Sequence, residues 1–344
     1  MDKNELIYKF YIICNSLKTM VSTNKSTEGR AESIADEIFN AEMIAISNYY
    51  NNQEQYKDVD LLKALAMLIV YKLDDEDVDS RAILEAMAQL QLYYELEGLY
   101  TNLVFAESKE AKFCHSCMNL ADNIDEVDKE EYKFISITNK LKTLVRQGWI
   151  DWKVSAPRLE SVSEHIFSTQ ILAIALYSEN VDYYSNVNIY RVLLMLAIHE
   201  LGETVIGDLT QFQISKDEKK KLEHAAVHEL LKDIPGGEEL ETLFLEFDER
   251  QTPDALFAHF CDKLDCDTQS TVYGNKGYVD LSDQEDNKTF HNERVQRLLS
   301  ELHTFGGMWV SFGQEVYGYD EPCMDYSRYL LKIVDEPIKK RKIQ

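Results

Sequence analysis

The hydrophobic positions of this chain fall in long runs rather than in an alternating pattern. The runs 61-LLKALAMLIVYKL-73 and 191-RVLLMLAIHEL-201 are too long for typical strands and are rich in Leu, Met and Ala. No stretch shows the sustained apolar and polar alternation of a half-buried strand. Only 13 Gly and 5 Pro interrupt the chain, and all five prolines lie at or beyond Pro157. These patterns predict an all-α fold.

Length, charge and cysteine content narrow the class of protein. A chain of 344 residues exceeds one compact core and favours two domains. With 36 basic and 61 acidic residues, the net charge of −25 repels polyphosphate, so we expect no nucleic-acid partner and no anionic-membrane partner. No apolar run reaches the roughly 18 residues of a membrane span. Charged residues interrupt the apolar N-terminus, and six cysteines are too few for a disulfide framework, so we expect a cytoplasmic protein with reduced thiols.

The chain also contains an internal similarity, found as five pairs of segments in the same order. The pairs are 17-LKTMV-21 and 141-LKTLV-145, 30-RAESIADEIF-39 and 158-RLESVSEHIF-167, 67-MLIVYKL-73 and 195-MLAIHEL-201, 96-LEGLY-100 and 240-LETLF-244, and 111-AKFCHSC-117 and 258-AHFCDKL-264. Two helical bundles of similar composition could match by accident, but the shared order favours duplication. We predict two helical domains, 1–128 and 129–344, joined near the charged stretch 124–133.

Four residues of the second domain form a candidate metal site. His165 lies in an amphipathic run, His199 and Glu200 end an apolar run, and Asp262 follows about sixty residues later. Two imidazoles and two carboxylates form a mixed set of the kind that holds Mn, Fe, Co, Zn or Mg. Each residue alone has a simpler explanation, because a histidine on an apolar helix is usually a hydrogen-bonded core residue and a buried carboxylate is usually ion-paired.

The motifs around these residues resemble the HD-domain metal-dependent phosphohydrolases, and most closely their small helical 5′-deoxynucleotidases. The resemblance covers about 145–275 and rests on four segments. These are 148-GW, 158-RLESVSEH, 199-HELGETVIGD and 262-DKLD. It implies one divalent metal ion held by His165, His199, Glu200 and Asp262.

The resemblance also implies roles for residues near the ion. Glu203 falls where these enzymes keep the acid that positions or deprotonates the attacking water, and Asp208 where they keep an acid that reads a sugar hydroxyl. Arg158 and Trp149 fall in the segment that lines the phosphate and nucleoside pocket. For Arg158, an ion pair with Glu160 is the structural alternative.

One position departs from the family pattern, since Glu200 stands where the family has Asp. The extra methylene, roughly 1.5 Å, keeps the charge but shifts the carboxylate, and a misplacement of about 1 Å can cost on the order of a hundredfold in rate. His224 and His228, spaced as neighbours on one helix face, could hold a second ion, although surface histidines are the simpler explanation.

The first copy lacks the ligand set. The positions equivalent to His165, His199, Glu200 and Asp262 are Glu37, Tyr71, Lys72 and His115. We expect the ammonium group of Lys72 to replace the missing cation near Glu37 and Asp75. The C-terminal aromatic residues Trp309, Tyr317, Tyr319 and Tyr326 indicate either internal packing or the surface of a homodimer.

The sequence therefore predicts a divalent-metal phosphohydrolase acting on small nucleotides, most simply 5′-deoxynucleoside monophosphates. The degenerate first copy and Glu200 leave two alternatives open. One is a catalytically silent regulator that binds nucleotide or metal, and the other is an HD-type oxygenase, which would need further histidine ligands.

Overall fold

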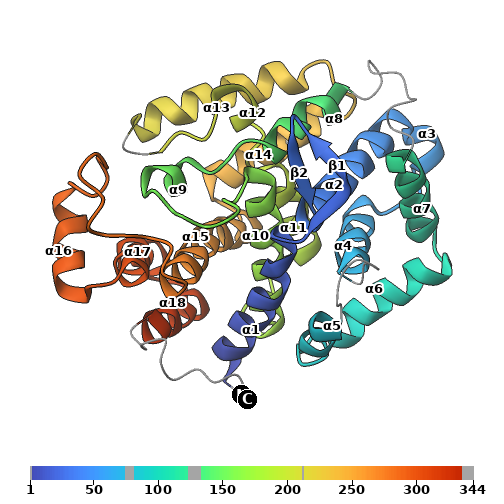
Figure 1. The fold of residues 1–344 in the computed structure, drawn as a ribbon. Coiled ribbons are helices and arrows are strands. Elements are labelled where there is room, and N and C mark those ends of the chain that lie inside the picture. Colours follow the sequence, from blue (N-terminus) through green and yellow to red (C-terminus); the bar gives the residue numbers. More distant parts are fainter. Residues whose placement is uncertain (1, 74–80, 123–132, 211–212, 335–344) are drawn as a thin grey trace.

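A computed structural model describes residues 2–73, 81–122, 133–210 and 213–334. Helices dominate both halves of the chain, as predicted (Figure 1). The first half contains α1 (Lys3–Asn15), η1 (Ser16–Lys18), β1 (Val21–Thr27), β2 (Arg30–Ser33), α2 (Ile34–Asn51), α3 (Gln53–Tyr56), α4 (Leu61–Lys72), α5 (Arg81–Met87), α6 (Tyr93–Phe105) and α7 (Lys109–Asp122). The second half contains α8 (Lys133–Thr138), η3 (Asn139–Lys142), α9 (Gln147–Asp151), α10 (Val162–Ser178), α11 (Ile189–Ile198), α12 (Glu203–Ile206), α13 (Lys216–Leu231), α14 (Gly237–Glu249), α15 (Pro253–Asn275), α16 (Glu293–Leu302), α17 (Phe305–Gly313), η4 (Gln314–Tyr317) and α18 (Glu321–Val334).

A small antiparallel hairpin, β1 and β2, forms the only sheet among the described residues. Thr27 pairs with Arg30 across a turn in which Glu28 and Gly29 both have positive φ, of 48° and 84°. Positive φ at both central residues matches the twist of a two-residue hairpin turn. The prediction missed this hairpin because β1 is polar at every position after Val21 and β2 has only four residues, so neither strand displays an alternating pattern.

The central helices α2 and α10 begin in the same way. Ser33 and Asp36 form a capping box at the start of α2, and Ser161 and Glu164 form one at the start of α10. In each box the serine hydroxyl accepts from one backbone N–H, and the acid accepts from the other, so two donors at the helix end are satisfied. The two capping boxes occupy equivalent positions of the repeated segments 30–39 and 158–167.

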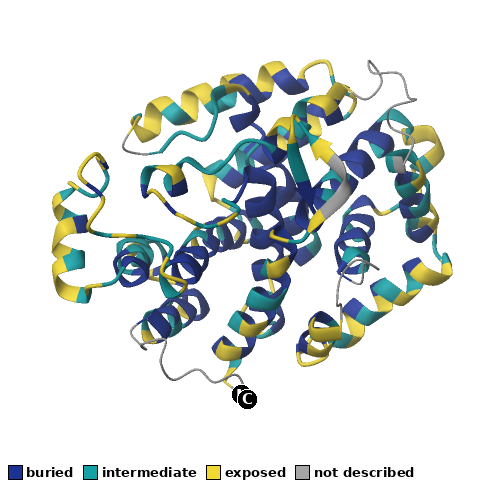
Figure 2. Cartoon of the chain, viewed as in Figure 1, coloured by how far each residue is buried: buried dark blue, intermediate teal, exposed yellow. Residues whose placement is uncertain are grey.

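The two halves share one hydrophobic core. It draws buried side chains from helices of both halves, and α2 packs directly against α10. Figure 2 shows the central helices buried on most sides, with exposed residues on the outer helices. A smaller apolar cluster gathers around Trp149, Trp152 and Phe305. The predicted boundary at 128 lies outside the described residues.

Equivalent residues of the two halves make reciprocal contacts across this core. The Arg30 guanidinium donates to Glu164 at 3.0 Å, and the Arg158 guanidinium donates to Asp36 at 3.0 Å. Arg158 stands 128 positions after Arg30, and Glu164 stands 128 positions after Asp36. This reciprocity supports a chain built from two copies, which stays a prediction.

Three further features concern the surface and the thiols. All six cysteines are unpaired. Tyr317 and Tyr326 are fully buried, so they pack internally, whereas Tyr319 is 70% exposed. Within the described residues, no helix combines the length and the apolar content that a membrane span requires.

Candidate metal centre

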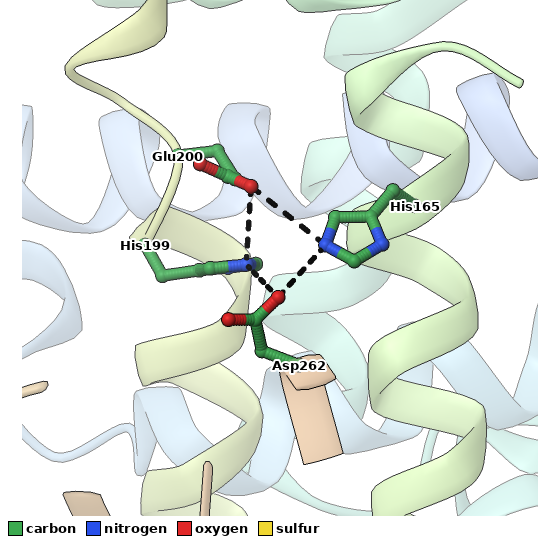
Figure 3. Close-up of side chains that lie close together, drawn as sticks. All are labelled: His165, His199, Glu200 and Asp262. Carbon is green, nitrogen blue, oxygen red and sulfur yellow. Dashed lines mark hydrogen bonds and ion pairs between the residues drawn. The ribbon is translucent and has the colours of Figure 1, made fainter. Parts of the chain in front are cut away.

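The four predicted ligands converge from three separate parts of the second half (Figure 3). His165 lies on α10, His199 and Glu200 follow the end of α11, and Asp262 lies on α15. One ligand atom from each lies within 4.8 Å of those of the other three. His165 Nε2 is 3.2 Å from Asp262 Oδ1, and His199 Nε2 is 3.9 Å from the same oxygen. Helix packing therefore brings together donors separated by up to 97 positions.

His199 is held in the state that a metal ligand needs. Its Nδ1 lies 2.7 Å from the carbonyl oxygen of Leu196, which can only accept, so Nδ1 carries the proton. Its Nε2 is buried, has no hydrogen-bond partner, and faces the other three ligands. Burial lowers the pKa of His199 and keeps the ring neutral. A buried nitrogen lone pair without a partner is costly unless something binds it, and an ion at this position would do so.

His165 is fully buried between two carboxylates. Its Nδ1 lies 2.7 Å from Asp265 Oδ2, and its Nε2 lies 3.2 Å from Asp262 Oδ1. Burial is the largest influence and lowers the pKa of His165, but the hydrogen bonds with Asp262 and Asp265 outweigh it and raise the pKa to about 9. A proton on Nε2 and a metal ion compete for the same lone pair, so binding of an ion would release that proton.

Glu200 reaches the cluster despite its extra methylene. Its Oε1 lies 3.7 Å from Nε2 of His165 and 3.7 Å from Nε2 of His199. The same oxygen accepts a hydrogen bond of 2.6 Å from Arg146 Nη1. Burial is the largest influence and favours the neutral acid, but the surrounding cationic groups, Arg146 and His165 among them, outweigh it and hold the pKa of Glu200 far below its ordinary range. Glu200 is therefore an ionised oxygen donor.

The spacing of the ligand atoms fits a divalent ion. Ligands bound at about 2.1 Å in tetrahedral or octahedral geometry lie about 3.0–3.4 Å from their nearest neighbours. The neighbouring N···O distances in this cluster run from 3.2 to 3.9 Å, so small side-chain movements bring all four donors to one ion. Two imidazoles and two carboxylates suit Mn, Fe, Co, Zn or Mg.

A cavity of about 870 Å³ opens onto this cluster. His199, Glu200 and Asp262 form part of its wall, so an ion held there would meet a ligand from the cavity. Three other predicted site residues also line it, namely Trp149, Glu203 and Asp208. Basic side chains contribute to the wall as well, namely Arg146, Lys216, Lys219, Lys220, Arg250, Lys263 and Arg294. The volume is of the size typical of small-molecule sites.

Glu203 combines burial with an unsatisfied oxygen. Its Oε1 lies 3.2 Å from Lys219 Nζ, while its Oε2 is buried and has no hydrogen-bond partner. Burial, followed by the negative charges of Glu200 and Asp208, raises the pKa of Glu203 well above its ordinary value. A carboxyl group with a raised pKa, at the wall of a cavity beside the four candidate ligands, is suited to exchange a proton with a bound molecule.

Asp208 and Trp149 are fixed at the cavity wall by hydrogen bonds. Asp208 Oδ2 accepts from the backbone N–H of Gln147 at 2.6 Å. The Trp149 indole donates to Glu160 Oε2 at 2.6 Å, and its ring lies 4.9 Å from that of Trp309. The cavity therefore has an acidic group and an aromatic wall near the ligand cluster.

The structure places Arg158 away from this cavity, contrary to the prediction of a phosphate-pocket role. Its guanidinium donates to Glu164 at 2.7 Å and to Asp36 at 3.0 Å. The alternative partner, Glu160, does not take this role either. Two cations contact the ligands: Arg146 lies 2.6 Å from Glu200 Oε1, and Lys263 Nζ lies 2.8 Å from Asp262 Oδ2. Sequence reasoning missed both, although Arg146 stands three positions before Trp149 and Lys263 follows Asp262 directly. Asp36 belongs to the other half of the chain, so its pairing with Arg158 depends on tertiary structure.

The other candidate histidines do not join the cluster. His224 Nε2 lies 2.7 Å from Asp248, and His228 Nδ1 lies 3.0 Å from Glu241. Each histidine pairs with a carboxylate, which agrees with the simpler explanation that both are surface histidines. Within the described part of the chain, the four-residue cluster contains two histidines, His165 and His199, which gives no support to an oxygenase with additional histidine ligands.

The equivalent positions of the first half have no such arrangement. Lys72 Nζ lies 3.9 Å from Glu37 Oε2, in agreement with a cation standing near this acid. His115 contacts the carbonyl oxygen of Leu103 at 2.8 Å. Asp75, the second acid expected near Lys72, lies outside the described residues.

A helical bundle that brings two imidazoles and two carboxylates together beside a cavity has the donor set of a divalent-metal site. Residues 138–303 match the model of the HD domain. A 5′-deoxynucleotidase HDDC2 of Dictyostelium discoideum is 32% identical over 146 residues, which span 41% of this chain and 76% of that protein. A 5′-deoxynucleotidase hdd1 of Schizosaccharomyces pombe is 30% identical over 158 residues, spanning 43% and 76%. The chain belongs to the HD-domain family of metal-dependent phosphohydrolases.

Among solved structures, a conserved hypothetical protein from Pyrococcus furiosus is 26% identical to this chain. The match covers 53% of this chain and 96% of that protein, with a TM-score of 0.36.

Proposed function

We propose that the chain hydrolyses the phosphomonoester of small nucleotides, most simply 5′-deoxynucleoside monophosphates, with one divalent ion held by His165, His199, Glu200 and Asp262. The observation that carries this proposal is the partnerless Nε2 of His199, which faces three further ligand atoms at the wall of a nucleotide-sized cavity. The names of the two curated relatives, both 5′-deoxynucleotidases, support the substrate class.

The ion would supply positive charge that polarises a phosphoryl oxygen and eases deprotonation of the attacking water. Glu203 then takes the proton of that water at Oε2, the carboxylate oxygen that has no partner. Lys219, 3.2 Å from Oε1, orients the carboxylate toward the cavity. General-base help of this kind contributes about 10²–10⁴-fold to a rate.

Arg146 and Trp149 are the proposed contacts for the two ends of the substrate. Arg146 lies at the ligand cluster, and its planar guanidinium suits the phosphate group. Trp149, packed beside Trp309, offers an aromatic wall to the nucleoside. Asp208 lines the same cavity and could accept a hydrogen bond from a sugar hydroxyl.

A second candidate follows from the 2.6 Å bond between Arg146 and Glu200. A guanidinium on a ligand oxygen competes with the ion for that oxygen and weakens metal binding. In this alternative the chain is a catalytically silent regulator that binds nucleotide without turnover.

Phosphate release from a panel of nucleoside monophosphates, with Mn, Co or Mg added to metal-stripped protein, tests the proposal. Metal analysis of the wild type beside His199→Ala tests the ligand set, and His228→Ala is the matched control because His228 lies outside the cluster. We expect stoichiometric metal and phosphate release from the wild type and the control, and loss of both in His199→Ala. Nucleotide binding without phosphate release would favour the regulator, and equal metal content in all three proteins would refute the site.

A further inference from the structure

A buried chain of hydrogen bonds connects the first half of the protein to the metal centre. Tyr11, on α1, donates its hydroxyl to Asp265 Oδ1 at 2.6 Å. The other oxygen of Asp265 lies 2.7 Å from His165 Nδ1. All three side chains are fully buried. The ligand His165 is thus held through Asp265 by a residue 254 positions away from that acid.

These hydrogen bonds determine which nitrogen of the His165 ring carries the proton. An ionised carboxylate can only accept, so Asp265 requires the proton of His165 on Nδ1 and directs Nε2 to the other ligands. The Tyr11 bond occupies the second oxygen of Asp265 and prevents the carboxylate from rotating. A residue that, like Asp265, hydrogen-bonds directly to a metal ligand is worth about 10–100-fold in metal affinity.

Other contacts between the two halves are repeated at equivalent positions: each half supplies the cation to one contact and the acid to the other. Lys18 pairs with Glu160 of the second half, and the equivalent Lys142 pairs with Glu32 of the first half at 3.0 Å. Arg30 and Arg158 are reciprocal in the same way. These contacts therefore serve the packing of the two halves.

The bond between Tyr11 and Asp265 is not repeated. The segments 10-FYIICNSLKTMV-21 and 134-FISITNKLKTLV-145 align Tyr11 with Ile135, and the alignment of His115 with Asp262 brings Asp265 to Met118. Ile135 belongs to the apolar core, and the partly buried Met118 packs against it. The hydrogen-bonded polar residues thus stand on the side that has the ligands, and apolar residues stand at the equivalent positions of the side that lacks them.

We propose that Tyr11 is a positioning residue for the metal centre, supplied by the degenerate half to the active half. This proposal rests on the proposed metal site. It gives the first half a function in the chemistry of the second: the first half lacks the ligand set, but it fixes the orientation of a ligand in the half that has it.

Titration of metal-stripped protein with Mn²⁺ in a calorimeter, and with Co²⁺ followed by visible absorption, tests the proposal. We expect Tyr11→Phe to weaken Mn²⁺ binding by about three- to tenfold and to change the Co²⁺ spectrum, because it acts one bond further out than the partners worth about 10–100-fold. Tyr184→Phe is the matched control, since it removes an equally buried bond of 2.8 Å to Asp320, outside the ligand cluster.

A double-mutant cycle separates positioning from general destabilisation. If Tyr11 acts through Asp265, Tyr11→Phe causes no further loss of Mn²⁺ affinity in an Asp265→Ala background. Asp265→Asn, expected to lose about 10–100-fold, tests the same chain should Tyr11→Phe not fold. Failure of the wild type to bind metal refutes the proposed function itself. If the wild type binds Mn²⁺ and Tyr11→Phe binds it with equal affinity, the role of Tyr11 is overturned while the proposed function stands. The same holds if Asp265→Asn binds Mn²⁺ with unchanged affinity.

Discussion

Glu42 and Gln170 meet where the two halves pack together, and they stand at equivalent positions, 128 residues apart. Glu42 is fully buried on α2, and its Oε1 accepts a hydrogen bond of 2.7 Å from Gln170 Nε2 on α10. Two oxygens at this contact, Glu42 Oε2 and Gln170 Oε1, have no hydrogen-bond partner. Burial raises the pKa of Glu42 from 4.5 to about 8. We predict that Glu42→Gln stabilises the protein and removes a pH dependence of its stability.

The magnitude follows from linkage between protonation and folding. Because the pKa of Glu42 is higher in the folded protein, its contribution to stability is complete below pH 4.5 and is lost as the pH rises to about 8. That difference corresponds to at most about 5 kcal/mol, of which roughly 3 kcal/mol is lost by pH 7. A glutamine has no proton to lose, and its amide N–H can donate to Gln170 Oε1.

Urea unfolding of the wild type and Glu42→Gln between pH 5 and pH 8.5 measures this effect. We expect similar stabilities at pH 5 and an advantage for the variant that grows with pH. Glu301→Gln, at an exposed position on α16, is the control and should follow the wild type at every pH. A constant difference between Glu42→Gln and the wild type, or a variant that is less stable at high pH, would refute the reasoning.

Three other sets of substitutions test the site and the first half. Glu203→Gln should retain metal, measured by elemental analysis, and lose about 10²–10⁴-fold in kcat, because the amide cannot take a proton; retained kcat would exclude Glu203 as the base. Arg146→Ala should raise KM for the nucleotide, measured by steady-state kinetics. Arg158→Ala should lower the free energy of unfolding, measured in urea, and leave KM unchanged. The reverse pattern would support a role for Arg158 in phosphate binding. Lys72→Met should cost about 1 kcal/mol of stability by losing its pairing with Glu37, and unchanged or greater stability in urea unfolding would contradict a compensating cation.

The ligand set could be predicted because its donors stand in local motifs. His165, His199, Glu200 and Asp262 are recognisable from residue type and spacing, and the structure brings them within reach of one ion. Whether each donor has its lone pair available depends on its partners. The bond from His199 to the carbonyl oxygen of Leu196 and the contact of Arg146 with Glu200 appear only in three dimensions.

The two arginines illustrate the same limit. Arg146 and Arg158 lie twelve positions apart in one segment, and nothing in that segment indicates which guanidinium lies at the cavity. The structure assigns Arg158 to Asp36, an acid of the other half, and leaves Arg146 at the cavity. A charge is placed by the acids that surround it in space, and those come from distant parts of the chain.

By itself, the amino-acid order determined the helices and the chemistry of the donors, because apolar periodicity and side-chain type act locally. The tertiary structure decided the partners of those donors, such as Tyr11 behind Asp265, because hydrogen bonds and ion pairs depend on distance in space and direction. It also decided that the half without ligands packs against the half that has them, where buried acids such as Asp36 and Glu164 pair with arginines of the opposite half.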